Sequence, residues 1–310
     1  MNEVVNFLQL VVTAMVPFIL AAQGTMLGGR VGIFNVSQEG VMIVGASVGF
    51  LVSLKVGGSL IGLIAAAAVG AIFGLVLAWT TTVLRLDQFV IGLALFFAAM
   101  GVATLLYKVV IGVTLTPPLI PTLTDWKIPL LGDIPWVGPI LFRQDGMVYF
   151  AFLLSGFLYW LLYRTNLGLK LRSVGENPKA ADSLGVNVTR ARLGAATAGS
   201  ALMALGGAYL PMIYTGTYTE GIVAGRGWLA IALTFFGGWR PQFILVGAGF
   251  FAGMEVLALR VQVAGVSVPH QFVLMLPYVA TLLVMIFAFR WARVPGFLGR
   301  NYDRESRTAA

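Results

Sequence analysis

The stretch GGSLIGLIAAAAVGAIFGLVLAWTT, residues 57–81, contains no charged side chain. An α-helix rises about 1.5 Å per residue, and about 20 consecutive apolar residues cross the roughly 30 Å hydrocarbon core of a bilayer. The stretch therefore predicts a membrane-spanning helix. Apolar runs of similar length recur along the whole chain, so this stretch indicates the class of the fold.

The composition of the chain agrees with that reading. Of the 310 residues, 59% are hydrophobic and only 10% are charged, whereas about 25% of the residues in a soluble domain are charged. We expect an all-α integral membrane protein that forms a polytopic helical bundle in one domain, residues 1–310. The chain has no cysteine, which excludes disulfides, thiolate metal sites and cysteine nucleophiles.

The apolar runs predict about nine membrane segments, within a range of eight to ten. The first run follows MNEVVNFLQL, which lacks the basic region and the cleavage site of a signal peptide, so we expect this run to be retained as a span. The predicted segments lie at about 4–26, 33–54, 57–81, 88–108, 147–163, 191–213, 227–239, 241–260 and 270–290.

The basic residues predict the orientation, because cytoplasmic loops carry an excess of Lys and Arg. With nine spans and the C-terminus inside, the N-terminus is outside, and 14 of the 20 basic residues are cytoplasmic. The net charge of +8 is therefore a topology signal, and we expect no nucleic-acid partner. The outer six basic residues are Lys55, Lys108, Lys127, Arg143, Arg226 and Arg260.

Three regions outside the spans follow from this topology. Residues 109–145 form an extracytoplasmic loop, rich in proline and carrying Trp126 and Trp136, which suits the membrane interface. Residues 164–190 form a cytoplasmic loop, and residues 291–310 form a cytoplasmic tail. The outer loop could dock an external partner or simply cover the bundle.

A polar cluster lies between the first two spans, in GGRVGIFNVSQEGVMIVGA, residues 28–46. Its glycines suggest a broken or re-entrant segment, and polar groups at membrane depth need a cavity or a partner. We interpret Asn35, Gln38 and Glu39 as candidates for a solute path; the alternative for Glu39 is a local pair with Arg30. Gln88, at the start of the fourth span, is a further path candidate, while its neighbour Asp87 is better explained as a helix cap.

The segment between Arg226 and Arg240 has room for only about 13 apolar residues, or roughly 20 Å of helix. A half-helix is expected there, and the alternative is a full helix that continues through Gly237 and Gly238. Glu220 and Arg226 precede it and form either a loop ion pair or a gate. Glu255 could pair with Arg260 or face another helix. His270, the single histidine, has no clustered ligands, so no metal or catalytic role is expected.

GENPKAADSLGV, residues 175–186, predicts a short surface helix within the cytoplasmic loop. Asn177 can cap it, Pro178 can begin it and Gly185 can end it. Ala180, Ala181 and Leu184 would give it a small apolar face for a partner protein or for its own bundle. The candidate residues are Glu176, Asn177, Pro178, Lys179, Ala180, Ala181, Asp182, Ser183, Leu184 and Gly185.

Motifs along almost the whole chain resemble the permease subunits of ABC importers for nucleosides and simple sugars, in the superfamily of the ribose and branched-chain amino acid permeases. The chain is similar to the shorter of the two permeases that are usually paired. It departs from the pattern at Phe96 and Phe97, where relatives are often polar. The motifs that carry the resemblance are GGRVGIFNVSQEGVMIVGA (28–46), IPLLGDIPWVGPILFRQDGMVY (128–149), RTNLGLKLRSVGENPKAADSLGVNVTRAR (164–192), AGRGWLAIALTFFGGWRP (224–241) and LMLPYVATLL (274–283).

The resemblance implies a multi-pass protein of the cytoplasmic membrane that carries a small neutral solute, a nucleoside first and a simple sugar second. It implies a heterodimer with a second, longer permease, a cytoplasmic ABC ATPase that contacts the short helix at 175–186, and an extracytoplasmic binding protein or lipoprotein. It implies no cofactor and no enzymatic activity in this chain, since ATP would be hydrolysed by the partner. The alternative is an ATPase-independent secondary transporter for a polar metabolite, with Glu39 coupling to protons.

Overall fold

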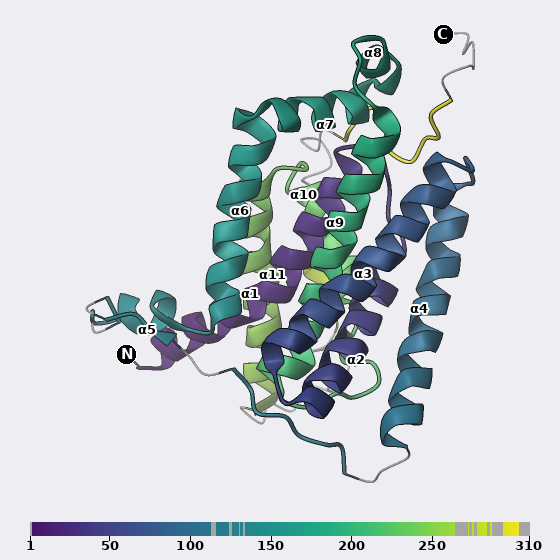
Figure 1. The fold of residues 1–310 in the computed structure, drawn as a ribbon. Helices are drawn as coiled ribbons and strands as arrows, with labels where there is room; N and C mark the ends of the chain where they lie inside the picture. Colours follow the sequence, from purple (N-terminus) through teal and green to yellow (C-terminus); the bar gives the residue numbers. More distant parts are fainter. Residues whose placement is uncertain are drawn as a thin grey trace.

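The computed structural model describes residues 2–112, 116–123, 126–129, 131–132, 134–263, 272, 275, 278–283, 286 and 294–303, which fold into a bundle of long helices (Figure 1). The helices are α1 (Asn2–Gly29), α2 (Gln38–Val56), α3 (Ser59–Thr82), α4 (Gln88–Ile111), α5 (Val137–Leu141), α6 (Gly146–Arg164), α7 (Asn166–Glu176), α8 (Pro178–Ser183), α9 (Val188–Tyr209), α10 (Arg226–Phe236) and α11 (Pro241–Val263). A π-helical turn, η1 (Leu210–Tyr214), extends α9, and β1 (Trp126–Lys127) pairs antiparallel with β2 (Arg143–Gln144).

Seven helices among the described residues are long and apolar enough to cross a membrane, and α10 is a shorter apolar helix. These seven helices correspond to the predicted segments at 4–26, 33–54, 57–81, 88–108, 147–163, 191–213 and 241–260. The predicted segment at 227–239 is α10, with 11 residues, and the segment at 270–290 lies mostly outside the described residues. The segment expected at 33–54 begins later, at Gln38, because residues 30–37 are not helical.

Helix α9 lies at the centre of the bundle against α1, α2 and α3. Small residues permit this close packing. A Cβ on Gly74 of α3 would lie 2.7 Å from the carbonyl oxygen of Ala196. Gly45 of α2 and Gly70 of α3 both pack on Ala204. These contacts place α2 and α3 directly beside α9.

Helix α10 ends at Phe236, and a turn with Trp239 at φ +59° separates it from α11. The alternative of one continuous helix to Pro241 is therefore wrong, and the half-helix is confirmed. Helix α11 runs antiparallel to α1, since Gln23 Nε2 donates to the carbonyl of Pro241 at 3.4 Å and Arg260 Nη2 donates to the carbonyl of Glu3 at 3.0 Å.

The two ends of the bundle differ in what they carry. The start of α1, α5 and the β1–β2 pair lie at one end, and α7, α8 and residues 294–303 lie at the other (Figure 1). At the first end, α4 continues to Ile111, so the loop expected from residue 109 starts slightly later. At the second end, the loop expected at 164–190 is largely helical, because α7 precedes α8. Thr165 caps α7 by accepting the N–H of Gly168 at 3.1 Å.

Candidate functional site

The candidate site is built around the α1–α2 break, defined as residues 30–37, and the first turn of α2. Asn35 turns the chain into α2, because its Oδ1 accepts the backbone N–H of Ser37 at 2.9 Å and the hydroxyl of Ser37 at 2.6 Å. The Nδ2 of Asn35 donates to Ser200 Oγ on α9 at 3.1 Å. Both of its amide atoms are thus used within the protein, and the side chain is buried.

The first turn of α2 lies well inside the bundle. Gly40 packs on the backbone of Phe96, and a Cβ at residue 40 would lie 2.7 Å from the carbonyl oxygen of Phe96. Phe96 is eight residues beyond the start of α4 at Gln88, which corresponds to about 12 Å of helix. The ring of Phe96 packs edge-on against Trp228 of α10, with 5.9 Å between centroids. The break therefore carries irregular backbone deep into the helical bundle.

Glu39 meets the N-terminus of α10 at this depth. Its two carboxylate oxygens accept the backbone N–H groups of Gly225, at 2.8 Å, and of Gly227, at 2.7 Å. Helix N-termini leave such N–H groups without intrahelical partners, and they favour a negative charge. Gly227 permits the approach, since a Cβ there would lie 2.6 Å from Glu39 Cα. Glu39 thus fixes the half-helix α10 to α2.

The alternative of a local pair between Glu39 and Arg30 is wrong. Arg30 Nε donates to the carbonyl of Trp239 at 2.9 Å, and its Nη2 donates to the hydroxyl of Tyr163 at 2.9 Å. Arg30 therefore joins the end of α1 to the α10–α11 turn and to α6, whereas Glu39 binds the N-terminus of α10.

The side chain of Gln38 is fully buried. Its carbonyl oxygen accepts a hydrogen bond from the hydroxyl of Thr25 on α1. Its amide nitrogen has no hydrogen-bond partner among the residues that the structure describes. A buried donor of this kind is costly unless something accepts from it, so Gln38 is the path candidate that retains hydrogen-bonding capacity.

Gln88 holds the break in place. Its Oε1 accepts the N–H of Phe34 at 2.8 Å, and its Nε2 donates to the carbonyl of Arg300 at 3.2 Å. The side chain is only 2% exposed. Its neighbour Asp87 caps α4 by accepting the N–H of Val90 at 2.9 Å, as expected.

The two gate candidates, Glu220 and Arg226, are engaged with other residues. Arg226 forms an ion pair with Glu255 of α11, in which both side chains are largely buried. Glu220 lies 3.9 Å from the Lys108 ammonium in an exposed pair. The expected pairing of Glu220 with Arg226 is therefore not found. The partner of Arg226 could not be chosen from sequence, because Glu255 lies on a separate helix.

The short helix α8 has the ends that the sequence predicted. Asn177 Oδ1 accepts the N–H of Ala180 at 3.0 Å, Pro178 begins the helix, and Gly185 follows it at φ +82°. The single apolar face expected from Ala180, Ala181 and Leu184 is corrected. Ala181 is 2% exposed and packs into the bundle, whereas Leu184 is 84% exposed.

The other α8 candidates divide in the same way. Glu176, Asn177, Lys179 and Ser183 are exposed and Pro178 is buried. Asp182 is half-buried and accepts a hydrogen bond from the hydroxyl of Tyr302 at 3.1 Å.

Arg192 is a buried residue that sequence reasoning assigned only to topology. Its side chain is fully buried, and its Nε donates to the carbonyl of Val31 in the break at 3.1 Å. Its Nη2 donates to the carbonyl of Arg300 at 3.2 Å. No local signal distinguishes it, because Arg190, two residues earlier on α9, is exposed.

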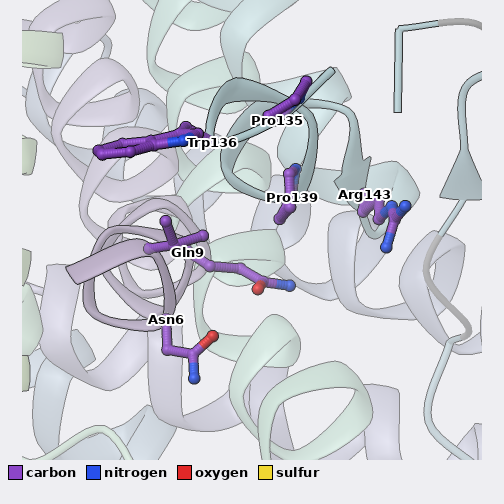
Figure 2. Close-up of a pocket in the computed structure, with 7 residues that line it drawn as sticks. Asn6, Gln9, Pro135, Trp136, Pro139 and Arg143 are labelled. Atoms are coloured by element: carbon purple, nitrogen blue, oxygen red, sulfur yellow. The ribbon is translucent and has the colours of Figure 1, made fainter. Parts of the chain in front are cut away.

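A separate pocket of about 460 Å³ opens at the other end of the bundle, between the start of α1 and α5. Figure 2 shows Trp136 and Pro139 above it, with Asn6 and Gln9 of α1 below and Arg143 at one side. It lies at the outer end of the expected topology, remote from Glu39.

Comparisons with known proteins agree with the motifs of the sequence. Residues 6–294 match the family model described as the permease component of the branched-chain amino acid transport system. The guanosine ABC transporter permease protein NupQ of Bacillus subtilis is 33% identical over 96% of this chain and 95% of its own. The nucleoside ABC transporter permease protein NupC of Lactococcus lactis is 32% identical over 97% of this chain and 98% of its own.

The chain is also similar to a protein named for a sugar. The putative glucose ABC transporter permease protein TsgC13 of Haloferax volcanii is 32% identical over 98% of this chain and 99% of its own. No solved structure matches the chain.

Proposed function

The chain belongs to the family of branched-chain amino acid transport system permease components, and on this premise we propose that it forms half of the solute path of an ABC importer for a nucleoside. Proteins of this family are transport subunits, so the chain is a membrane transport component and not an enzyme. The observation that carries the nucleoside proposal is the likeness to NupQ and NupC over nearly the full length of all three chains. A simple sugar is the second candidate solute, because TsgC13 is similar to the same extent.

The charges around the break favour a neutral solute. The Glu39 carboxylate accepts two backbone N–H groups and Arg226 is paired with Glu255. The Arg30 and Arg192 guanidinium groups donate to backbone carbonyls. A phosphate or a zwitterion would need a free opposite charge in a path of low dielectric constant. The unpaired amide of Gln38 instead suits the hydroxyl or carbonyl acceptors of a nucleoside. Asn35 and Gln88 would act by fixing the break, since their amides are already hydrogen-bonded.

The partners proposed are a second, longer permease, a cytoplasmic ABC ATPase and an extracytoplasmic binding protein. Helix α8 would contact the ATPase through its exposed Leu184. Helix α4 would face the second permease or lipid, because most of its apolar surface is exposed and, among the described residues, it packs mainly on α2 and α3. ATP hydrolysis would occur in the partner chain.

The orientation that we propose is the one predicted by the distribution of Lys and Arg. It places α7, α8 and residues 294–303 in the cytoplasm and the start of α1 outside. Opposite locations of these two ends in Figure 1 support it. Reporter fusions at residue 1 and residue 310 test the orientation, and a cytoplasmic N-terminus would contradict it.

The test of function combines assembly with uptake. The chain is expressed with its proposed partners, purified through a tag on this chain, and reconstituted in proteoliposomes with the binding protein. We expect an ATPase to co-purify and labelled guanosine or adenosine to accumulate only with ATP inside, with glucose and ribose as comparison solutes. ATP-independent uptake driven by a proton gradient would support the secondary-transporter alternative instead. Uptake of glucose but not of nucleosides would assign the sugar.

A further inference from the structure

Residues 294–303, VPGFLGRNYD, contact four separate parts of the proposed cytoplasmic end (Figure 1, yellow). We call this segment the strap. Its first half lies on the end of α7, where Phe297 N–H donates to the carbonyl of Gly175 at 2.9 Å and Gly296 N–H donates to Glu176 Oε2 at 3.2 Å.

The middle of the strap lies on the α1–α2 break. Gly299 N–H donates to the carbonyl of Gly32 at 3.1 Å. Gly32 has φ +84°, and a Cβ there would lie 2.9 Å from the carbonyl oxygen of Phe297. The carbonyl of Arg300 accepts from both Gln88 and Arg192. The strap and the break therefore fit together at contact distance and share two buried polar side chains.

The end of the strap joins α8 and the turn between α3 and α4. Tyr302 donates its hydroxyl proton to Asp182 Oδ2 of α8 at 3.1 Å, and its ring packs on the small apolar cluster that contains Ala181. Asn301 Nδ2 donates to the carbonyl of Arg85 at 2.7 Å, and Asp303 pairs with the Arg85 guanidinium at 2.8 Å.

These contacts make a continuous connection from α8 to the interior of the bundle. A displacement of α8 would move Tyr302, and through Tyr302 the strap backbone at residues 299–300. That backbone is hydrogen-bonded to Gly32, within the break, and to Gln88, which holds the break in place. The break leads directly into Glu39 and hence to α10. Chains of hydrogen bonds and packed groups of this kind can carry coupling between distant sites, and the strap reaches the break without passing through the long helices α6 and α9.

We propose that Tyr302 is a positioning residue for transport, through which the strap transmits movement of α8 to the α1–α2 break. The proposal rests on the proposed function, because it assigns the source of the movement to an ATPase on α8. Tyr302 touches no solute in this scheme. Its hydroxyl keeps α8 and the strap in one arrangement, so that the break moves when α8 moves.

The first experiment measures the contact without any ATPase. Amide hydrogen exchange is followed in the purified full-length permease and in Tyr302→Phe. Loss of a hydrogen bond to a charged carboxylate should speed exchange in 178–186 and 30–34 by about tenfold. Tyr159→Phe is the matched control: Tyr159 is an exposed tyrosine of α6 whose ring packs on Tyr163, and removal of its hydroxyl should leave both regions unchanged. Unchanged exchange in Tyr302→Phe would contradict the proposal that Tyr302 links α8 to the break.

The second experiment measures transmission in the reconstituted complex as solute carried per ATP hydrolysed. Tyr302→Phe should lower this ratio by about three- to tenfold with ATP hydrolysis retained, and Tyr159→Phe should not. Asp182→Ala should lower the ratio at least as far as Tyr302→Phe, and the double variant should be no worse than Asp182→Ala alone, because both changes remove the bond between these two side chains. Asp182→Asn, which retains an acceptor oxygen, should restore most of the ratio.

A normal ratio in Tyr302→Phe, or fully additive losses in the double variant, would overturn the role of Tyr302. A wild-type complex without ATP-driven uptake would instead contradict the proposed function. The two failures are distinguishable, because the exchange experiment reports on the strap in the permease alone.

Discussion

The two short helices α8 and α10 reach stability in opposite ways. Helix α8 lies at one end of the bundle and is capped by its own Asn177, at 3.0 Å from the N–H of Ala180. Helix α10 begins inside the bundle, and its first N–H groups are accepted by Glu39 of α2, a residue almost 190 positions away in sequence. Where water is absent, free backbone groups must be satisfied by the protein, so the buried short helix depends on a distant side chain.

The two helices also differ in how far their apolar side chains are buried. Leu229, Ala230 and Leu233 of α10 are buried in the bundle, whereas Leu184 at the end of α8 is 84% exposed. Helix α10 is therefore fixed within the proposed path, and α8 presents an apolar side chain outward. The interior of the bundle therefore holds α10, whereas α8 leaves Leu184 exposed for the contact proposed with the ATPase.

The largest expected effect comes from removing the distant cap of α10. Glu39→Ala leaves the buried N–H of Gly227 and the partly buried N–H of Gly225 without their acceptor, at a cost of about 1–3 kcal/mol each. We expect loss of nearly all uptake and a lower midpoint of thermal unfolding in detergent. Glu39→Gln keeps one acceptor but turns an NH₂ group toward a donor, so uptake should fall at least about tenfold.

The control for Glu39 is Glu220→Gln. Glu220 is exposed and lies 3.9 Å from Lys108, and exposed pairs contribute little. This variant should retain uptake and stability. If Glu39→Gln also transported normally, the carboxylate would not be needed to hold α10, and the contrast between the two helices would fail.

A smaller effect is expected at the exposed end of α8. Burying a leucine side chain contributes about 1.5–3 kcal/mol, so Leu184→Asp should weaken binding of the ATPase by about 10- to 150-fold. Insertion and unfolding temperature should be unchanged, because the side chain packs on little of its own chain. Co-purification of the ATPase and ATP-driven uptake measure the effect. If the variant retained both ATPase co-purification and uptake in full, Leu184 would not contact the ATPase.

The neighbouring Ala181 should behave differently, because it packs inward. Its Cβ lies in a buried cluster with Val31, Val174 and Val188, and overpacking a core site costs about 1–3 kcal/mol. Ala181→Trp should therefore lower the thermal unfolding midpoint of the isolated permease, whereas Leu184→Asp should not. Thermal unfolding of the two variants side by side separates these roles. Release of the ATPase by Ala181→Trp without any loss of stability would contradict the inward placement.

The features that sequence predicted well are those encoded locally. The membrane class follows from uncharged runs such as 57–81, and the ends of α8 follow from Asn177 and Gly185. The shortness of α10 follows from the spacing of Arg226 and Arg240, because two charges limit the apolar length between them. Each of these signals lies within one segment, and the structure has each of them where it was expected.

The features that sequence missed depend on pairs far apart in the chain. Glu39 was identified as a buried carboxylate, yet nothing in its neighbourhood indicated Gly225 as its partner. The same holds for Arg226 with Glu255 and for Gln88 with Arg300. Periodicity assigns a residue to a face of a helix but does not say which helix meets that face. Ala180, Ala181 and Leu184 were therefore predicted to share one apolar face, although of Ala181 and Leu184 only Ala181 packs into the bundle.

The smallest effect tests the local cap of α8. Asn177→Ala removes the acceptor for the N–H of Ala180, at 3.0 Å in the native helix, and loss of such a cap costs about 1 kcal/mol. Water can replace part of the lost bond because Asn177 is exposed. Helix α8 should therefore fray in a fraction of molecules, and ATP-driven uptake should fall by about two- to fivefold with the permease still folded. Asn177→Asp, which retains a capping oxygen, should transport normally, and hydrogen exchange at 180–184 should rise only in Asn177→Ala. A loss of uptake as large as that of Glu39→Ala would mean that α8, like α10, depends on more than its local sequence, and the distinction between the two helices would then have to be abandoned.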